Sequence, residues 1–85
     1  MKRTRRFIRH YRERIAQHPQ LRSEFLDAVT MFLHDPAAVN DHALKGKMSR
    51  ERAFAINADY RVIYADKEDH YLFKDVGTHR QVYSR

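Results

Sequence analysis

The spacing of the apolar residues changes near the middle of this chain of 85 residues, and the change restricts the folds that the chain can adopt. Before Pro36, apolar side chains recur every three or four residues, which is the period of an amphipathic helix. After a polar loop from Ala37 to Met48, they occur in short runs separated by turn residues, which is typical of strands. Helices followed by strands predict an α+β fold.

The first half predicts two helices joined by a short His-Pro turn. The first helix is expected from about Thr4 to Gln17. The second is expected to begin at Pro19, because proline suits a first helical turn, and to end at Asp35-Pro36, because the residue before a proline disfavours helical dihedral angles. The apolar stripes are Phe7, Ile8, Tyr11 and Ile15 in the first helix, and Leu21, Phe25, Leu26, Val29, Phe32 and Leu33 in the second.

The second half predicts a meander of three strands, from Ala53 to Ile56, from Tyr60 to Ala65 and from Tyr71 to Val76. The middle strand is apolar on both faces, so we expect it at the centre of the sheet. The first few residues of the chain are a candidate for an edge strand. Two helices alone cannot bury both stripes, so we expect the hairpin to pack on one face of a small antiparallel sheet, as a single domain over residues 1–85.

The composition restricts partners and compartment. Lys and Arg number 17 against 11 Asp and Glu, and the net charge of +6 favours a polyanionic partner. The absence of cysteine excludes disulfides, thiolate metal sites and a cysteine nucleophile, and the histidines lack the spacing of metal ligands. We therefore expect no metal or cofactor. No apolar run approaches the roughly 20 residues of a membrane-spanning helix, and the basic N-terminus lacks the apolar core of a secretory signal, which favours a cytoplasmic protein.

Polar side chains that suit RNA cleavage gather in and beside the predicted strands, on or near the sheet face that the helices leave open. When the ribose 2′-hydroxyl attacks the adjacent phosphate, the protein must remove one proton, donate another and stabilise the negative charge of the transition state. Imidazoles, a carboxylate, a tyrosine and a group of cations supply such groups here. The candidates are His42, His79, Asp59, Tyr83, Arg61, Lys45, Lys47, Arg50 and Arg52, with Asp41 beside them.

Three sequence blocks make this indication more specific. They read D-H-A-L-K-G-K from Asp41 to Lys47, N-A-D-Y-R-V-I-Y from Asn57 to Tyr64, and V-G-T-H-R-Q-V-Y from Val76 to Tyr83. In type, order and spacing they resemble the recurrent blocks of the RelE/YafQ superfamily of type II toxins, and the YafQ-like branch most of all. The resemblance covers essentially the whole chain and implies the RelE-like toxin fold.

The resemblance also implies an activity. Members of the superfamily are intracellular endoribonucleases that cut mRNA, typically in the ribosomal A site, and each is neutralised by a cognate antitoxin. This chain is therefore expected to be the toxin component of a type II toxin-antitoxin system and a ribosome-dependent mRNA interferase. Its expected partners are the antitoxin, mRNA and the ribosome.

Roles for individual residues follow from the same resemblance. His79 matches a histidine that transfers a proton, and Arg61 matches an arginine that contacts the scissile phosphate. Tyr83 matches an aromatic residue that stacks on or orients a base, while His42 and Asp59 match residues implicated in the YafQ branch. The basic cluster expected to face RNA comprises Lys45, Lys47, Arg50 and Arg52.

Two positions depart from the superfamily pattern. Ala55 stands where the YafQ branch has a further histidine, and Asp75 stands where both branches tend to be basic. These departures leave two alternatives open: a gyrase inhibitor like the ParE branch of the same fold, and an RNA-binding module without catalysis. The histidine of the C-terminal block, His79, argues against the ParE branch.

Overall fold

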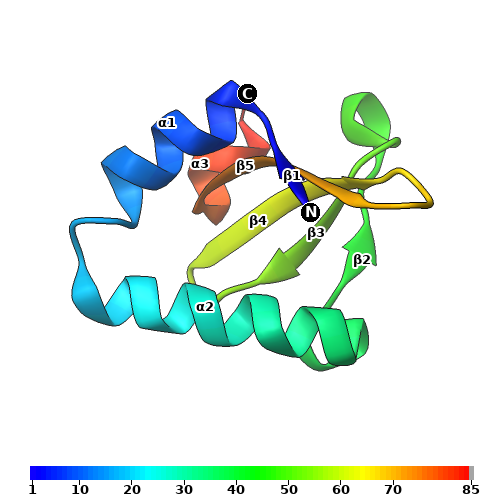
Figure 1. Cartoon of the computed structure of the whole chain (residues 1–85). Helices are drawn as coiled ribbons and strands as arrows, with labels where there is room; N and C mark the ends of the chain where they lie inside the picture. Colours follow the sequence, from blue (N-terminus) through cyan, green and yellow to red (C-terminus); the bar gives the residue numbers. More distant parts are fainter. Residues whose placement is uncertain (85) are drawn as a thin grey trace.

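A single five-stranded sheet forms the centre of the computed structural model, which describes residues 1–84 (Figure 1). The strand order is β1-β5-β4-β3-β2, so the middle strand of the predicted meander is central, as expected. Strands β2 to β5 pair in antiparallel fashion, whereas β1 adds to the edge of β5 in parallel. The strands are β1 (Lys2–Arg3), β2 (His42–Ala43), β3 (Arg52–Ala55), β4 (Tyr60–Asp66) and β5 (Tyr71–Thr78).

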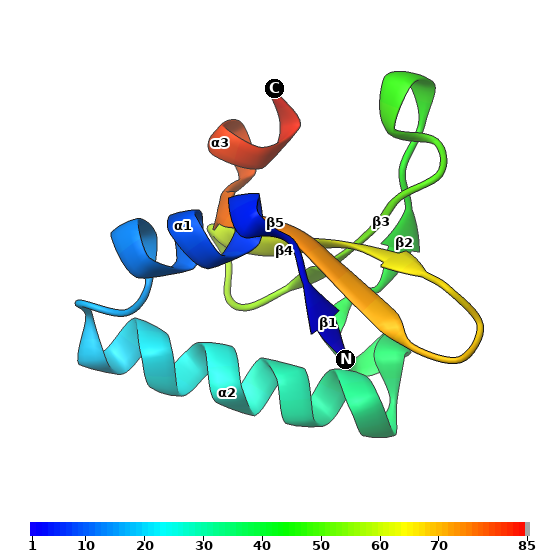
Figure 2. The same cartoon turned by 45° about the horizontal axis from the view of Figure 1, so that its top comes forward.

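Two helices cover one face of the sheet, and a third lies on the other face. Figure 2 shows α2 and α3 on opposite sides of the strands. Helix α1 begins after Thr4, whose hydroxyl accepts a hydrogen bond from the Phe7 amide, and α2 begins at a proline as predicted. The helices are α1 (Arg5–Arg14), α2 (Pro19–His34) and α3 (His79–Tyr83), with the short 3-10 helices η1 (Pro36–Val39) and η2 (Gly46–Met48).

The main core lies between the helical hairpin and the sheet, and aromatic rings dominate it. Phe32 of α2 stacks on Phe54 of β3 with ring centroids 4.3 Å apart, and Phe7 of α1 approaches Phe73 of β5 at 5.5 Å. Such ring pairs stabilise a core beyond the burial of their area. The predicted stripes supply the helical side of this core, except that three of their residues, Ile8, Leu26 and Leu33, are exposed.

Four short elements were not expected from the sequence. The residues after Thr78 form α3, and the segment from Pro36 to Met48, expected to be a loop, contains β2 and the two 3-10 helices. Strand β1 confirms the candidate edge strand. None of the helices described is both long enough and apolar enough to cross a lipid bilayer.

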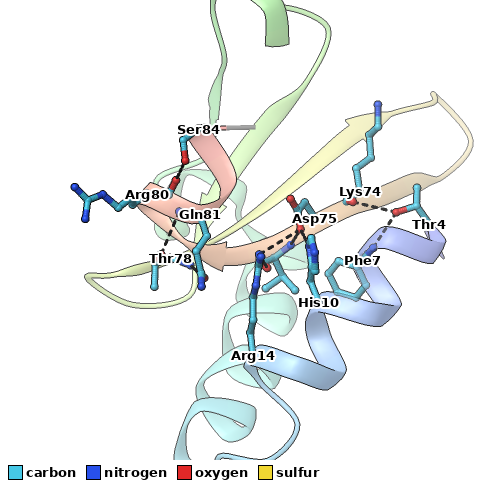
Figure 3. A network of polar contacts seen from close by, with 11 residues as sticks. Thr4, Phe7, His10, Arg14, Lys74, Asp75, Thr78, Arg80, Gln81 and Ser84 are labelled. Carbon is cyan, nitrogen blue, oxygen red and sulfur yellow. Dashed lines mark hydrogen bonds and ion pairs between the residues drawn. The ribbon is translucent and has the colours of Figure 1, made fainter.

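Polar contacts attach α1 along the edge of β5 in three successive steps (Figure 3). At the start of α1, the Thr4 hydroxyl donates to the Lys74 carbonyl at 3.0 Å. In the middle, His10 Nδ1 lies 2.5 Å from the carboxylate of Asp75, which is 1% exposed. At the end, Arg14 Nη1 donates to the Val76 carbonyl at 2.9 Å and lies 3.7 Å from the same carboxylate.

The structure therefore gives Asp75 a different role from the one suggested by its departure from the superfamily pattern. Its side chain does not replace a cation at the open face, because it is buried against α1. A buried carboxylate requires partners, and Asp75 has them in His10, Arg14 and the Val76 amide, which donates to it at 2.8 Å.

We predict that Asp75→Ala lowers the free energy of unfolding by about 3 kcal/mol, because the two basic side chains of α1 lose their buried partner. Urea unfolding followed by circular dichroism measures the change. Asp27→Ala on an exposed position of α2 is the control, and its effect is expected to stay within about 0.5 kcal/mol. Equal losses in the two variants would contradict the structural role of Asp75.

Candidate active site

Arg61 of β4 is half-buried on the face of the sheet opposite α2. Its cross-strand partners are Ala55 on β3 and Gly77 on β5. Paired residues share a face, so the methyl group of Ala55 flanks the arginine on one side, and on the other side Gly77 leaves room for Arg14 and Gln81. Its Nη1 donates to the carbonyls of Asn57 at 2.7 Å and Tyr60 at 3.0 Å. Within residues 1–84 both bonds use Nη1, which leaves the Nε and Nη2 hydrogens for an anion.

Helix α3 places two aromatic side chains beside this arginine. A capping box begins the helix: the Thr78 hydroxyl accepts from the Gln81 amide at 3.2 Å, and the Gln81 side chain accepts from the Thr78 amide at 2.8 Å. The His79 amide donates to the Asp59 carbonyl at 2.8 Å. The exposed His79 ring meets Tyr83 edge to face, with centroids 4.4 Å apart, so that the tyrosine supports the imidazole.

Tyr83 is half-buried in a small second cluster under α3, together with Leu44 and Met48. Burial raises the pKa of its phenol, and the nearby positive charge of Arg61 offsets part of that increase. Its hydroxyl is shielded from solvent and has no hydrogen-bond partner within the described residues. A buried hydroxyl without a partner is uncommon, and this one lies close enough to Arg61 to feel its charge.

Asp59 lies at the same end of the sheet, in the turn before β4. The Asn57 side chain accepts hydrogen bonds from the amides of Asp59 at 2.9 Å and Tyr60 at 2.8 Å, which fixes the turn. The carboxylate of Asp59 is exposed, while its carbonyl holds the backbone of His79. The turn and α3 are therefore locked together.

His42 lies on the other side of the open face, on the edge strand β2. It pairs with Ala53, and its Nδ1 donates to the Asn40 carbonyl at 2.9 Å. Since a carbonyl can only accept, Nδ1 carries the proton and Nε2 of the neutral ring is an acceptor. In register, His42 lies two strands away from Ile63, and Arg61 is two residues further along β4, so the backbones of His42 and Arg61 are about 12 Å apart. Figure 2 shows α3 and the segment between β2 and β3 rising on the same side of the sheet.

The predicted basic residues divide into two groups. Lys45, Lys47 and Arg50 are exposed on the segment around η2. Arg52 points to the helical side, where its guanidinium bonds the Asp41 carboxylate at 2.7 and 3.3 Å and the Tyr64 hydroxyl at 3.2 Å. The structure thus groups the first three near the open face and assigns the fourth to a network that holds β2 and β3 together.

That network fixes the approach to His42. Burial opposes the ionisation of Asp41, but hydrogen bonds from Arg52 and Tyr64 outweigh it and lower the pKa of the carboxyl. Burial, with the hydrogen bond to Asp41, raises the pKa of the Tyr64 hydroxyl, which stays protonated and donates to the carboxylate. Because Asp41 directly precedes β2, its anchoring restrains His42.

The residues that hold α3 in place were not identified from the sequence. Thr78 and Gln81 have the spacing of a capping box directly after a strand, a signal that predicts a helix start. Gly77 and Arg14 gave no such signal, because their contact joins segments more than 60 residues apart. No group of three or more potential metal ligands occurs among the described residues.

A family model of bacterial toxins of type II toxin-antitoxin systems, the YafQ toxins, matches residues 1–84. The chain belongs to the YafQ family. It is a toxin of a type II toxin-antitoxin system, which confirms the resemblance found in the sequence. No curated protein gives a significant match to this sequence.

Solved structures share the fold at low sequence identity. YafQ of Escherichia coli strain BL21(DE3) superposes with a TM-score of 0.79 at 18% identity, over 98% of this chain and 96% of that one. A copper-bound mutant toxin of Helicobacter pylori gives 0.71 at 23% identity, over 95% and 94%. YafQ in the Escherichia coli DinJ-YafQ complex gives 0.74 at 20% identity, over 98% and 96%. These matches confirm the α+β toxin fold.

In this YafQ-family chain, Gly77→Ala is predicted to displace α3. A Cβ atom at this position would lie 2.6 Å from Arg14 Nη1 and 2.7 Å from Gln81 Oε1, and both atoms are held by hydrogen bonds. We expect a loss of stability of about 1–3 kcal/mol, with changed NMR signals for the rings of α3. Thr78→Ser keeps the capping hydroxyl and is the control. Unchanged ring signals in Gly77→Ala would refute the close approach.

Acid is expected to weaken the Asp41 network. A carboxyl whose pKa is lowered by folding stabilises the protein above its unfolded value, 3.8, and that contribution disappears as the pH falls through the folded pKa. The difference in unfolding free energy between wild type and Asp41→Asn should therefore be constant near neutral pH and shrink below about pH 4. Urea unfolding at several pH values measures it. A difference that grows on acidification would contradict the network.

Proposed function

We propose that this toxin is an endoribonuclease that cleaves mRNA on the ribosome through attack of a ribose 2′-hydroxyl on the adjacent phosphate. The main support is the position of Arg61: a half-buried cation on the open face, flanked by Ala55 and Gly77, with imidazoles on both sides. A phosphate bound there meets donors that are already fixed in place, which is how protein sites stabilise a developing negative charge.

The two histidines supply the proton transfers in this mechanism. Nε2 of His42 accepts the proton of the 2′-hydroxyl, since its Nδ1 is already bonded to a carbonyl. As the new bond from the 2′-oxygen to phosphorus forms, Arg61 neutralises the added charge on the phosphoryl oxygens. The bond from phosphorus to the 5′-oxygen then breaks, and protonated His79 donates a proton to that oxygen. Imidazoles suit both roles because they titrate near neutral pH.

Asp59 and Tyr83 position these groups. The Asp59 carbonyl holds the backbone of His79, which fixes the start of the helix that carries the imidazole. Tyr83 supports the His79 ring through an edge-to-face contact. Lys45, Lys47 and Arg50 attract the RNA backbone, whereas Arg52 contributes through the network that positions β2.

A cognate antitoxin is the second partner in this proposal. The similar YafQ of Escherichia coli has been crystallised with DinJ as a toxin-antitoxin complex. An acidic protein that binds the basic surface of this chain would keep mRNA away from Arg61. Because ribosomes and mRNA are cytoplasmic, the proposed activity takes place in the cytoplasm.

Cleavage of ribosome-bound mRNA by the purified protein, mapped at nucleotide resolution, tests the activity. We expect His79→Ala and Arg61→Ala each to lower the single-turnover rate by about 100-fold or more, because each removes a proton donor or the charge that stabilises the transition state. His34→Ala, at the exposed end of α2, and Arg12→Ala, on α1, are the matched controls and should retain the wild-type rate.

Two results would reject this proposal. Full activity in both His79→Ala and Arg61→Ala would show that the reaction occurs elsewhere. A wild-type protein that inhibits DNA supercoiling and cuts no RNA would favour the gyrase-inhibitor alternative, since a YoeB/ParE toxin of Agrobacterium tumefaciens has the same fold with a TM-score of 0.68 at 18% identity. The fold alone does not separate the two activities.

A further inference from the structure

A second basic surface lies beside the candidate active site, formed by segments far apart in the sequence. It is a depression of about 500 Å³ lined by Arg6 of α1, Lys74 of β5 and residues 47–51 of the η2 segment. We call it the basic depression. Four of its side chains are cations, and a single carboxylate, that of Glu51, accompanies them.

Hydrogen bonds and an ion pair fix the relative positions of its three parts. The Thr4 amide donates to the Phe73 carbonyl at 2.9 Å, and the Thr4 hydroxyl to the Lys74 carbonyl, so Arg6 is held close to Lys74. On the other side, Lys74 Nζ pairs with Glu51 Oε2 at 2.7 Å, which joins β5 to the η2 segment. Figure 3 shows the Lys74 side chain extending away from α1.

The charge of the basic depression selects an anion. The ion pair between Lys74 and Glu51 neutralises one cation, while Arg6, Lys47 and Arg50 form no ion pair within residues 1–84. Two of these three are arginines, whose planar forks bond two oxygens of a phosphate at once. The depression is shallow, and five of its seven lining residues are charged, so a phosphate group on an extended chain fits it better than an apolar ligand does.

The basic depression adjoins the open face around Arg61. Met48 lines the depression and also packs in the cluster that contains Tyr83. Along β5, Lys74 precedes Gly77, the partner of Arg61, by three residues, or about 10 Å of strand. An RNA strand whose scissile phosphate binds Arg61 can therefore place another of its phosphates in the depression.

We propose that the basic depression is a second RNA phosphate site, which binds the backbone of the substrate strand beside the cleavage point. This inference rests on the proposed function, and it assigns a role to Arg6 and Lys74, which lie outside the residues suggested by the superfamily resemblance. Arg6 and Arg50 grip the phosphate oxygens, Lys47 adds charge, and the Lys74–Glu51 pair holds the two walls together.

Binding of a short single-stranded RNA with 2′-O-methyl groups throughout tests this site, because the probe has no 2′-hydroxyl and cannot be cut. Affinity is measured by fluorescence anisotropy at several salt concentrations for wild type, Arg6→Ala, Arg50→Ala and Arg12→Ala. Arg12 is on α1 as well and its loss changes the net charge equally, but it lines the apolar groove between α1 and α2. It is the matched control.

We expect Arg6→Ala and Arg50→Ala each to weaken binding by about 3-fold to 10-fold at 0.1 M salt and to reduce the slope of log affinity against log salt by about 0.7, the value for one lost single-strand phosphate contact. Arg12→Ala should keep the wild-type slope. If all three variants lose affinity equally, only net charge matters and the site is rejected. Thermal unfolding of each variant confirms that the fold is retained.

A parallel arm with small ribosomal subunits that carry no mRNA identifies the RNA that supplies the phosphate. If the affinity for the oligonucleotide depends on Arg6 and Arg50, the phosphate comes from the substrate strand. If only the affinity for the subunits depends on them, the site binds ribosomal RNA and the proposal as stated is overturned. The binding result is independent of cleavage. A wild-type protein that binds the probe through these arginines but cuts no mRNA would refute the nuclease activity and leave the phosphate site standing.

Discussion

The rest of this structure depends on the contacts that the buried carboxylate of Asp75 makes with His10 and Arg14 of α1. Strand β1 pairs with only two residues of β5, so the remaining edge of β5 is open for α1 to cover. Helix α1 packs its apolar stripe in the core and has basic residues in its last turn, which a negative charge on the strand can bind. Asp75 supplies that charge and binds His10 and Arg14 together. The cost of burying the carboxylate is offset by its contacts with His10, Arg14 and the Val76 amide.

The contact between Arg14 and β5 also links α1 to the candidate active site. Arg14 also bonds the Val76 carbonyl, and this leaves room only for glycine at the next position. Gly77 in turn flanks Arg61 and precedes Thr78, which caps the helix that carries His79. A helix in the first fifth of the sequence thereby defines where the last helix begins, although α3 has only five residues and little stability of its own.

These long-range contacts explain how far the sequence alone could be interpreted. Apolar spacing and the proline at position 36 predicted both long helices, the meander and its central strand, because these features depend on local periods. Arg61, His79 and Tyr83 became candidates for the site through short sequence blocks. The role of Asp75 could not be found in this way, since a single aspartate in a strand has no period, and its partners lie some 60 residues away. Arg52 was expected to face RNA for a different reason: the sequence shows a basic cluster, but it does not show that Arg52 points to the helical side of the sheet, where it binds Asp41.

Ala55 stands where the YafQ branch has a histidine, and its neighbour across the sheet is Arg61. A histidine there would crowd the guanidinium from the β3 side. With alanine, that side is open, and the two remaining imidazoles lie on opposite sides of the arginine, at β2 and at α3. The proposed reaction needs one proton acceptor and one proton donor. His42, whose Nε2 is an acceptor, and His79, whose ring is exposed, supply both, so the chemistry requires no third imidazole.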